Sequence, residues 1–115
     1  MSLKNILLVV SDMEQSKVFY HDLFGLQVIR DFSENVILTE GLVLQDKKIW
    51  EEKIGAKYSL GNACELFFEE KDWDAFLERA ERYEICFVSD VTTNSWGKRS
   101  VMLKDPDGHL IEVAE

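Results

Sequence analysis

The stretch that decides the fold reads ILLVVSDMEQSKVFYHDLFGL, residues 6–26. Its five consecutive apolar residues, Ile6–Val10, predict a buried strand. Ser11 with Glu14 three residues later is a capping-box pattern, in which a hydroxyl and a carboxylate satisfy free amides at a helix start. One stripe of side chains then recurs at helical spacing as far as Gly25, a residue that commonly ends helices. The stretch therefore predicts a strand followed directly by a helix.

Three short strand signals follow this helix, at Leu26–Phe32, Val36–Thr39 and Leu42–Gln45. Turn-prone residues separate them. The first part of the chain therefore predicts a βαβββ module over approximately residues 3–45. Residues 46–61 are polar and mixed, and we expect them to connect two modules, with room for a short helical turn.

The same order of signals starts again after this connection. Asp72 can cap a helix whose apolar residues follow the i, i+3, i+4, i+7 pattern. Strands are expected before and after this helix, at Ala63–Glu69, Ile85–Ser89, Arg99–Leu103 and His109–Ala114. The second module thus covers approximately residues 62–115.

The two halves can be superposed as an internal repeat. Asp12 and Asp72 both open a helix, and the last strands match as Gly41–Gln45 against Gly108–Glu112. A repeat of this length is a signal at the level of the fold. We expect an α+β fold of two tandem βαβββ modules, which form a cupped mixed sheet with the helices outside.

Composition limits the classes of protein that fit. The 115 residues, 46% of them hydrophobic, suit one globular domain over residues 1–115. The net charge of −9 disfavours nucleic acid and membrane surfaces as partners; it is compatible with a cationic ligand, although solubility alone also explains it. Ile6–Val10 is too short for a signal segment or membrane span, so we expect a cytoplasmic protein. Cys64 and Cys86 are expected to be buried thiols rather than a disulfide.

Residue parity predicts which side chains share a face, because side chains alternate across a strand. It places Asn5, Gln45, Glu65 and Glu112 on the face opposite the helices. Among apolar neighbours such as Phe67, this is where a ligand site is expected. For the two amides, a position in water at the rim explains the pattern equally well. A mid-strand carboxylate such as Glu112 needs water, a partner or a ligand.

Glu65 and Glu112 are the candidate catalytic residues. Two carboxylates on one apolar concave face would repel each other and be partly desolvated, which suits a general acid or base. The same pair could equally anchor a cationic ligand.

Two tryptophans and one arginine are further candidates for ligand binding. Trp50 in the connection and Trp96 before a strand are not explained by helical spacing, and such side chains can stack on planar or cationic ligands. A position at the cup edge or a dimer seam explains Trp96 equally well. Arg99 can pair with a carboxylate or with a ligand anion, and a surface pair is the default expectation.

The sequence also resembles a known superfamily. VSDMEQS (10–16) and FYHDLFGL (19–26) look like the opening signature of vicinal oxygen chelate proteins, the glyoxalase/bleomycin resistance protein/extradiol dioxygenase family. Trp96-Gly97 and then DPDGHLIE (105–112) resemble their closing signature. The resemblance implies paired βαβββ modules, commonly a homodimer with two cups. The activities it implies include glyoxalases, dioxygenases, fosfomycin-modifying enzymes and metal-free bleomycin-binding proteins.

The resemblance also implies where a metal would be bound. In metal-dependent members the ligands come from the first and last strand of each module, here Asn5, Gln45, Glu65 and Glu112. Only Glu112 matches the usual ligand type, because histidine is typical at the positions of Asn5 and Glu65. Such an oxygen set is a poor zinc, nickel or iron(II) site but could hold magnesium, manganese or calcium weakly. No cofactor is therefore favoured beyond a weakly bound divalent metal.

Three functional hypotheses follow. The leading one is a glyoxalase/bleomycin-resistance-like protein that binds a small cationic or aromatic molecule in a cup between modules without a tightly bound transition metal. The resemblance implies that this protein is a homodimer. The alternative is a divalent-metal-dependent lyase, isomerase or dioxygenase that uses Glu112. A purely structural interaction module is the third. The sequence leaves open whether the chain is catalytic.

Overall fold

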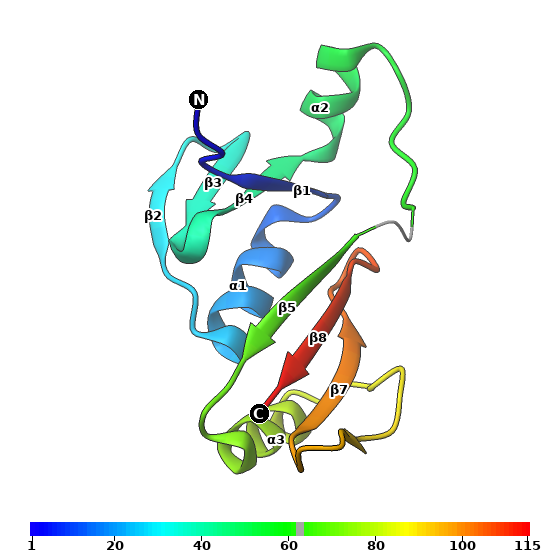
Figure 1. Cartoon of the computed structure of the whole chain (residues 1–115). Coiled ribbons are helices and arrows are strands. Elements are labelled where there is room, and N and C mark those ends of the chain that lie inside the picture. Colours follow the sequence, from blue (N-terminus) through cyan, green and yellow to red (C-terminus); the bar gives the residue numbers. More distant parts are fainter. Residues whose placement is uncertain (62–63) are drawn as a thin grey trace. The chain divides into compact units, whose positions relative to one another are not determined.

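The computed structural model describes residues 1–61 and 64–115 and divides the chain into two compact units, Met1–Ser59 and Leu60–Glu115 (Figure 1). Each unit contains a βαβββ module, so the predicted α+β fold of two tandem modules is confirmed. Asn62 and Ala63 lie outside the described residues. The predicted start of the strand Ala63–Glu69 therefore falls outside them as well.

The first unit has the strand order β1-β4-β3-β2, in which β1 runs parallel to β4 and the other pairs are antiparallel. The helix α1 packs against β4. A second helix, α2, occupies the predicted connection and is capped by Asp46, whose carboxylate accepts from the Ile49 amide at 3.0 Å. The elements are β1 (Ile6–Val10), α1 (Met13–Phe24), β2 (Val28–Asp31), β3 (Asn35–Leu38), the 3-10 turn η1 (Thr39–Gly41), β4 (Leu42–Asp46) and α2 (Lys47–Ile54).

The start of α1 differs from the capping box predicted at Ser11 and Glu14. The N-cap is Asp12, whose extended backbone lets its carboxylate accept from the Gln15 amide at 3.0 Å. The prediction was one residue too early, because a carboxylate at position 12 also reaches the amide three residues on. The helix ends at Gly25 with φ of 71°, as predicted.

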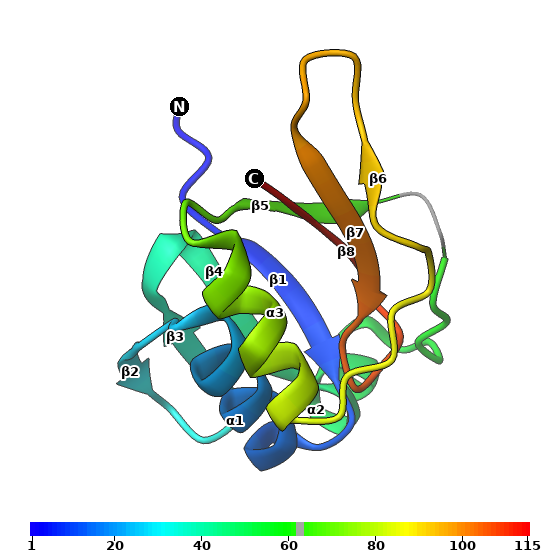
Figure 2. The ribbon, with the colours of Figure 1, turned by 90° about the horizontal axis from the view of Figure 1, so that it is seen from below.

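The second unit has the strand order β5-β8-β7-β6, with β5 parallel to β8. Asp72 caps its helix as predicted, since its carboxylate accepts from the Ala75 amide at 3.1 Å. Figure 2 shows β6 and β7 joined into a hairpin. The elements are β5 (Glu65–Glu69), α3 (Trp73–Arg82), β6 (Thr92–Thr93), β7 (Arg99–Lys104) and β8 (Leu110–Ala114).

The strand predicted at Ile85–Ser89 is wrong. This segment is irregular, and the strand that pairs with β7 comes later, at Thr92–Thr93. The segment does contact β7, because the Val88 amide donates to the Met102 carbonyl at 2.8 Å and the Ser89 hydroxyl accepts from the Met102 amide at 3.0 Å. A side chain thus takes the place of the second backbone bond that a ladder would need.

The expected burial of the cysteines is also wrong. Cys64 and Cys86 are free and exposed. Cys64 precedes β5, which begins at Glu65, and Cys86 lies in the segment that forms no strand. Neither thiol therefore has the inward-facing strand position that the prediction required.

The alternation of faces is clearest in β8. Ile111 and Val113 are buried, whereas Leu110, Glu112 and Ala114 between them are half-buried. In contrast, β4 is buried on both faces from Leu42 to Gln45. One side of β8 in the second sheet is therefore accessible, whereas both sides of β4 in the first sheet are buried. Of the helices in the described ranges, none has the length and apolar character needed to cross a membrane.

Candidate functional site

The candidate site is the face of the second sheet that is turned away from α3, here called the open face. Arg99 marks the opposite face, the α3 side, because its guanidinium lies 5.6 Å from the centre of the Trp73 ring on α3. Ser100 is the next residue of β7, so its side chain lies on the open face. By strand alternation and register, the open face comprises Glu65, Phe67 and Glu69 of β5, Leu110, Glu112 and Ala114 of β8, and Ser100, Met102 and Lys104 of β7.

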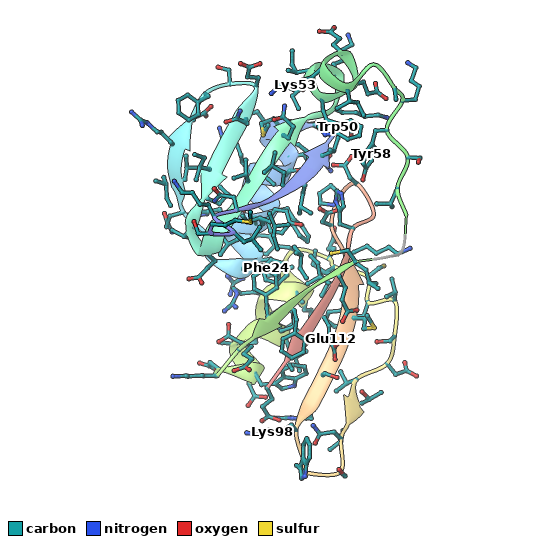
Figure 3. All side chains as sticks on the ribbon, turned by 45° about the horizontal axis from the view of Figure 1, so that its top comes forward. Phe24, Trp50, Lys53, Tyr58, Lys98 and Glu112 are labelled. Atoms are coloured by element: carbon teal, nitrogen blue, oxygen red, sulfur yellow. The ribbon has the colours of Figure 1, made fainter. Side chains whose placement is uncertain are left out.

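Glu112 lies at the centre of this face (Figure 3). Its register partners are Phe67 on β5 and Met102 on β7, so one row across the sheet reads aromatic, carboxylate, thioether. Glu112 is half-buried, and Phe67 is 56% exposed. Neither neighbour in this row offers Glu112 a polar group, so a bound cation could pair with its carboxylate.

Glu65 shares the open face with Glu112, as parity predicts. Its register partner is Leu110, which places it one diagonal step from Glu112. The spacing of strands and the rise per residue put the two Cα atoms about 8 Å apart. The two candidate carboxylates therefore belong to one surface.

Met102 is a residue of this face that the sequence reasoning missed. Parity within the predicted strand Arg99–Leu103 could have found it, because Ser100 and Met102 alternate with the buried Val101 and Leu103. The missing information was which residue of β8 lies opposite, and that is set by register.

Asn5 and Gln45 lie in the first unit, and the nitrogens of their side-chain amides donate to backbone carbonyls. The Asn5 Nδ2 donates to the Gly41 carbonyl at 3.3 Å. Gln45 is only 4% exposed, and its Nε2 donates to the carbonyls of Glu34 at 3.1 Å and Asp46 at 3.4 Å. Gln45 pairs with Val9, which lies four residues after Asn5, so the Cα atoms of Asn5 and Gln45 are roughly 14 Å apart.

The match of Gly41–Gln45 with Gly108–Glu112 is wrong by two residues. Both helices begin after an aspartate cap with the same offset, which makes Leu7 the counterpart of Phe67. The partner of Leu7 is Val43, whereas that of Phe67 is Glu112. The first sheet therefore carries a buried valine at the position where the second sheet carries its central carboxylate.

The two candidate tryptophans have different surroundings. Trp50 lies on α2, with its ring edge-on to that of Tyr58 at 5.6 Å between centroids (Figure 3). Trp96 is 86% exposed in the loop between β6 and β7. The Asn94 side chain shapes this loop by accepting from the amides of Trp96 at 2.9 Å and Lys98 at 3.0 Å.

Arg99 lies on the α3 side of the sheet and so does not join Glu112. Its guanidinium forms two hydrogen bonds with the Glu115 carboxylate, at 2.8 and 3.1 Å, and lies over the Trp73 ring. The side-chain hydrogen bond from Arg99 is the main cause that lowers the pKa of Glu115 to about 2. The default expectation of a pair with a carboxylate is confirmed.

A buried carboxylate closes the turn that leads into β8. Asp105 accepts from the amides of Asp107 and His109, and its second oxygen lies 2.7 Å from the His109 Nδ1. The hydrogen bond with Asp105 raises the pKa of His109, against the opposing effect of burial. This arrangement sets the start of β8 and hence the position of Glu112 three residues later.

Comparison with known proteins agrees with this architecture. Residues 3–115 match the family model of the glyoxalase-like domain. The metallothiol transferase FosB of Lysinibacillus sphaericus (strain C3-41) is 25% identical over 115 residues, which cover 96% of this chain and 79% of that protein.

Solved structures show the same fold. A protein of unknown function from Agrobacterium tumefaciens str. C58 is 31% identical with a TM-score of 0.85, covering 100% of this chain and 94% of that one. Lactoylglutathione lyase from Agrobacterium tumefaciens is 25% identical with a TM-score of 0.75, covering 99% and 92%. The chain belongs to the glyoxalase-like domain family, within the vicinal oxygen chelate superfamily.

Proposed function

We propose that the chain binds a small organic cation on the open face, without requiring a transition metal. The observation that carries the proposal is the row Phe67–Glu112–Met102, in which a half-buried carboxylate lies in register between an aromatic ring and a thioether. Ligand sites in proteins combine apolar surface with a few convergent polar groups, and this row has that composition.

The charge of the open face supports a cationic ligand. Glu65, Glu69 and Glu112 lie on it, against the single lysine Lys104 at one corner, where it pairs in register with Leu110. Within residues 1–61 and 64–115, none of the three carboxylates forms an ion pair. A ligand cation would therefore meet carboxylates that have no protein cation to neutralise them.

The residues present do not fit a transition-metal site. Zinc, nickel and iron(II) favour histidine or cysteine ligands, whereas the open face offers carboxylates on β5 and β8. In the first unit, Gln45 is only 4% exposed, and the buried Val43 occupies the counterpart of Glu112. We therefore assign no chemical step to a metal.

The test is ligand-observed NMR screening of an aromatic-amine fragment library against the full chain in the presence of EDTA. We expect binders that survive the chelator and that Glu112→Gln weakens about tenfold, because a charge at contact distance is lost. Glu52→Gln, which removes an exposed carboxylate on α2, is the matched control and should leave binding unchanged. Binding that requires an added metal would overturn the proposal.

A second candidate is a divalent-metal-dependent enzyme that uses Glu112. It is favoured by the resemblance to a protein named as a metallothiol transferase over 96% of the chain. Elemental analysis of freshly purified protein separates the two. A stoichiometric transition metal that is lost in Glu112→Gln supports the enzyme and contradicts the metal-independent binder.

A further inference from the structure

We infer that the cation recognised by the open face is a methylated ammonium group, either quaternary or tertiary. This inference rests on the proposed function and names its ligand class. It starts from Phe67, whose ring is exposed at the centre of its strand and is surrounded by Glu65, Glu69 and Glu112. An aromatic face with negative charge around it attracts large cations through the ring quadrupole.

The positions between the carboxylates are apolar. Leu110 and Ala114 stand on either side of Glu112 along β8, and Met102 is its partner on β7. N-methyl groups can contact such side chains, and a thioether is soft and polarizable. The face thus offers apolar contact at close range and charge around it, which matches a cation whose surface is made of methyl groups.

Two other classes of cation fit this surface less well. A tightly held hard metal ion needs several protein oxygens that converge on one point, whereas Glu112 is separated from both Glu65 and Glu69 by a diagonal step. A primary ammonium is compact and strongly hydrated, and it loses that hydration unless acceptors replace it. The side chains in the central row offer it one carboxylate.

Lys104 makes the distribution of charge on the open face asymmetric. It shares a row with Glu65 and Leu110, at the far end from Glu65. Its charge repels a cation from that corner and leaves the Phe67 side as the favoured position. The ligand head group is therefore expected over β5 and β8 rather than over β7.

The experiment is a titration of the 15N-labelled full chain at constant ionic strength with three probes that share a 2-hydroxyethyl chain. Choline carries a trimethylammonium, ethanolamine a primary ammonium, and 3,3-dimethylbutan-1-ol a neutral tert-butyl group. We expect choline to shift the amides of β5 and β8 and to bind about tenfold more tightly than either of the others, because it combines charge with methyl contact.

Variants locate the effect. Phe67→Leu keeps the site apolar but removes the ring, and should weaken choline binding about three- to fivefold. Glu112→Gln should weaken it about tenfold. The controls are Phe32→Leu, another exposed phenylalanine in the first unit, and Glu52→Gln, and both should bind as the unaltered chain does.

The outcomes separate this inference from the proposed function. Equal binding of choline and ethanolamine overturns the methylated class and leaves a general cation site. If no probe binds while an aromatic-amine fragment binds in a manner sensitive to Glu112→Gln, the inference fails and the proposed function stands. If neither binds, both fail.

Discussion

The Asp105 carboxylate shows how one side chain can organise the entry to a functional strand. It accepts from the Asp107 and His109 amides through one oxygen and contacts the His109 ring through the other. The sequence predicts this turn because it contains a proline and a glycine, two residues that favour tight turns. That Asp105 rather than Asp107 is the buried acceptor depends on how the turn folds back on β7.

The first prediction concerns the pH dependence of this pair. The pKa of His109 is raised in the folded chain, so its contribution to stability is present below the unfolded value of about 6.5 and is lost as the pH rises through the folded value. His109→Gln should therefore lower the free energy of unfolding more at about pH 5.5 than at about pH 9. Urea unfolding at both pH values measures the difference.

Asp105→Asn provides the second arm of this test. It keeps the shape of the side chain but removes the charge that holds the proton on His109. We expect this variant to show the same reduced pH dependence as His109→Gln. If both variants followed the pH profile of the unaltered chain, the pair would contribute nothing through its charge.

At the scale of elements, helix starts were predicted more accurately than strands in the second unit. Asp72 caps α3 where the sequence places the cap, because capping depends on a few adjacent residues. The strand expected at Ile85–Ser89 failed because β-structure needs a partner, and β7 pairs instead with Thr92–Thr93. Local chemistry is readable in the sequence, whereas pairing is a property of distant segments.

The second prediction tests the cap of α3. Asp72→Ala removes the acceptor for the Ala75 amide and should lower the free energy of unfolding by about 1 kcal/mol. Asp72→Asn keeps an acceptor oxygen at the same place and should cost less. Thermal and urea unfolding of the two variants give the comparison, and equal losses would show that the charge rather than the hydrogen bond matters.

At the scale of the whole molecule, the two modules share a topology but use their sheets differently. Val43 and Glu112 occupy equivalent positions in the last strands of the two sheets, yet Val43 is 6% exposed and Glu112 is half-buried on the open face. The repeat therefore accounts for the fold and not for the site. A core residue stands at one position and a candidate binding residue at the other.

The third prediction exchanges the residue types at positions 43 and 112. Val43→Glu places a charge in a buried strand and should lower the free energy of unfolding by about 3 kcal/mol or more. Glu112→Val should leave it unchanged or raise it by up to about 1 kcal/mol, because a functional carboxylate gives way to a residue that favours strands. Urea unfolding measures both effects.

The same pair links stability to binding. Glu112→Val should weaken choline binding in the NMR titration at least as much as Glu112→Gln, while the protein remains folded. A large loss of stability in this variant would instead assign Glu112 a structural role.

The sequence alone determined the two βαβββ modules, the helix cap at Asp72 and the faces of strands such as β8, because these follow from spacing and local hydrogen bonding. Only the tertiary structure decided which residue lies beside which across a sheet. Register placed Met102 and Phe67 next to Glu112 and moved the counterpart of Glu112 from Gln45 to Val43. The physical reason is that strand pairing is set by contacts between segments far apart in the chain, and a shift of two residues leaves every local pattern intact.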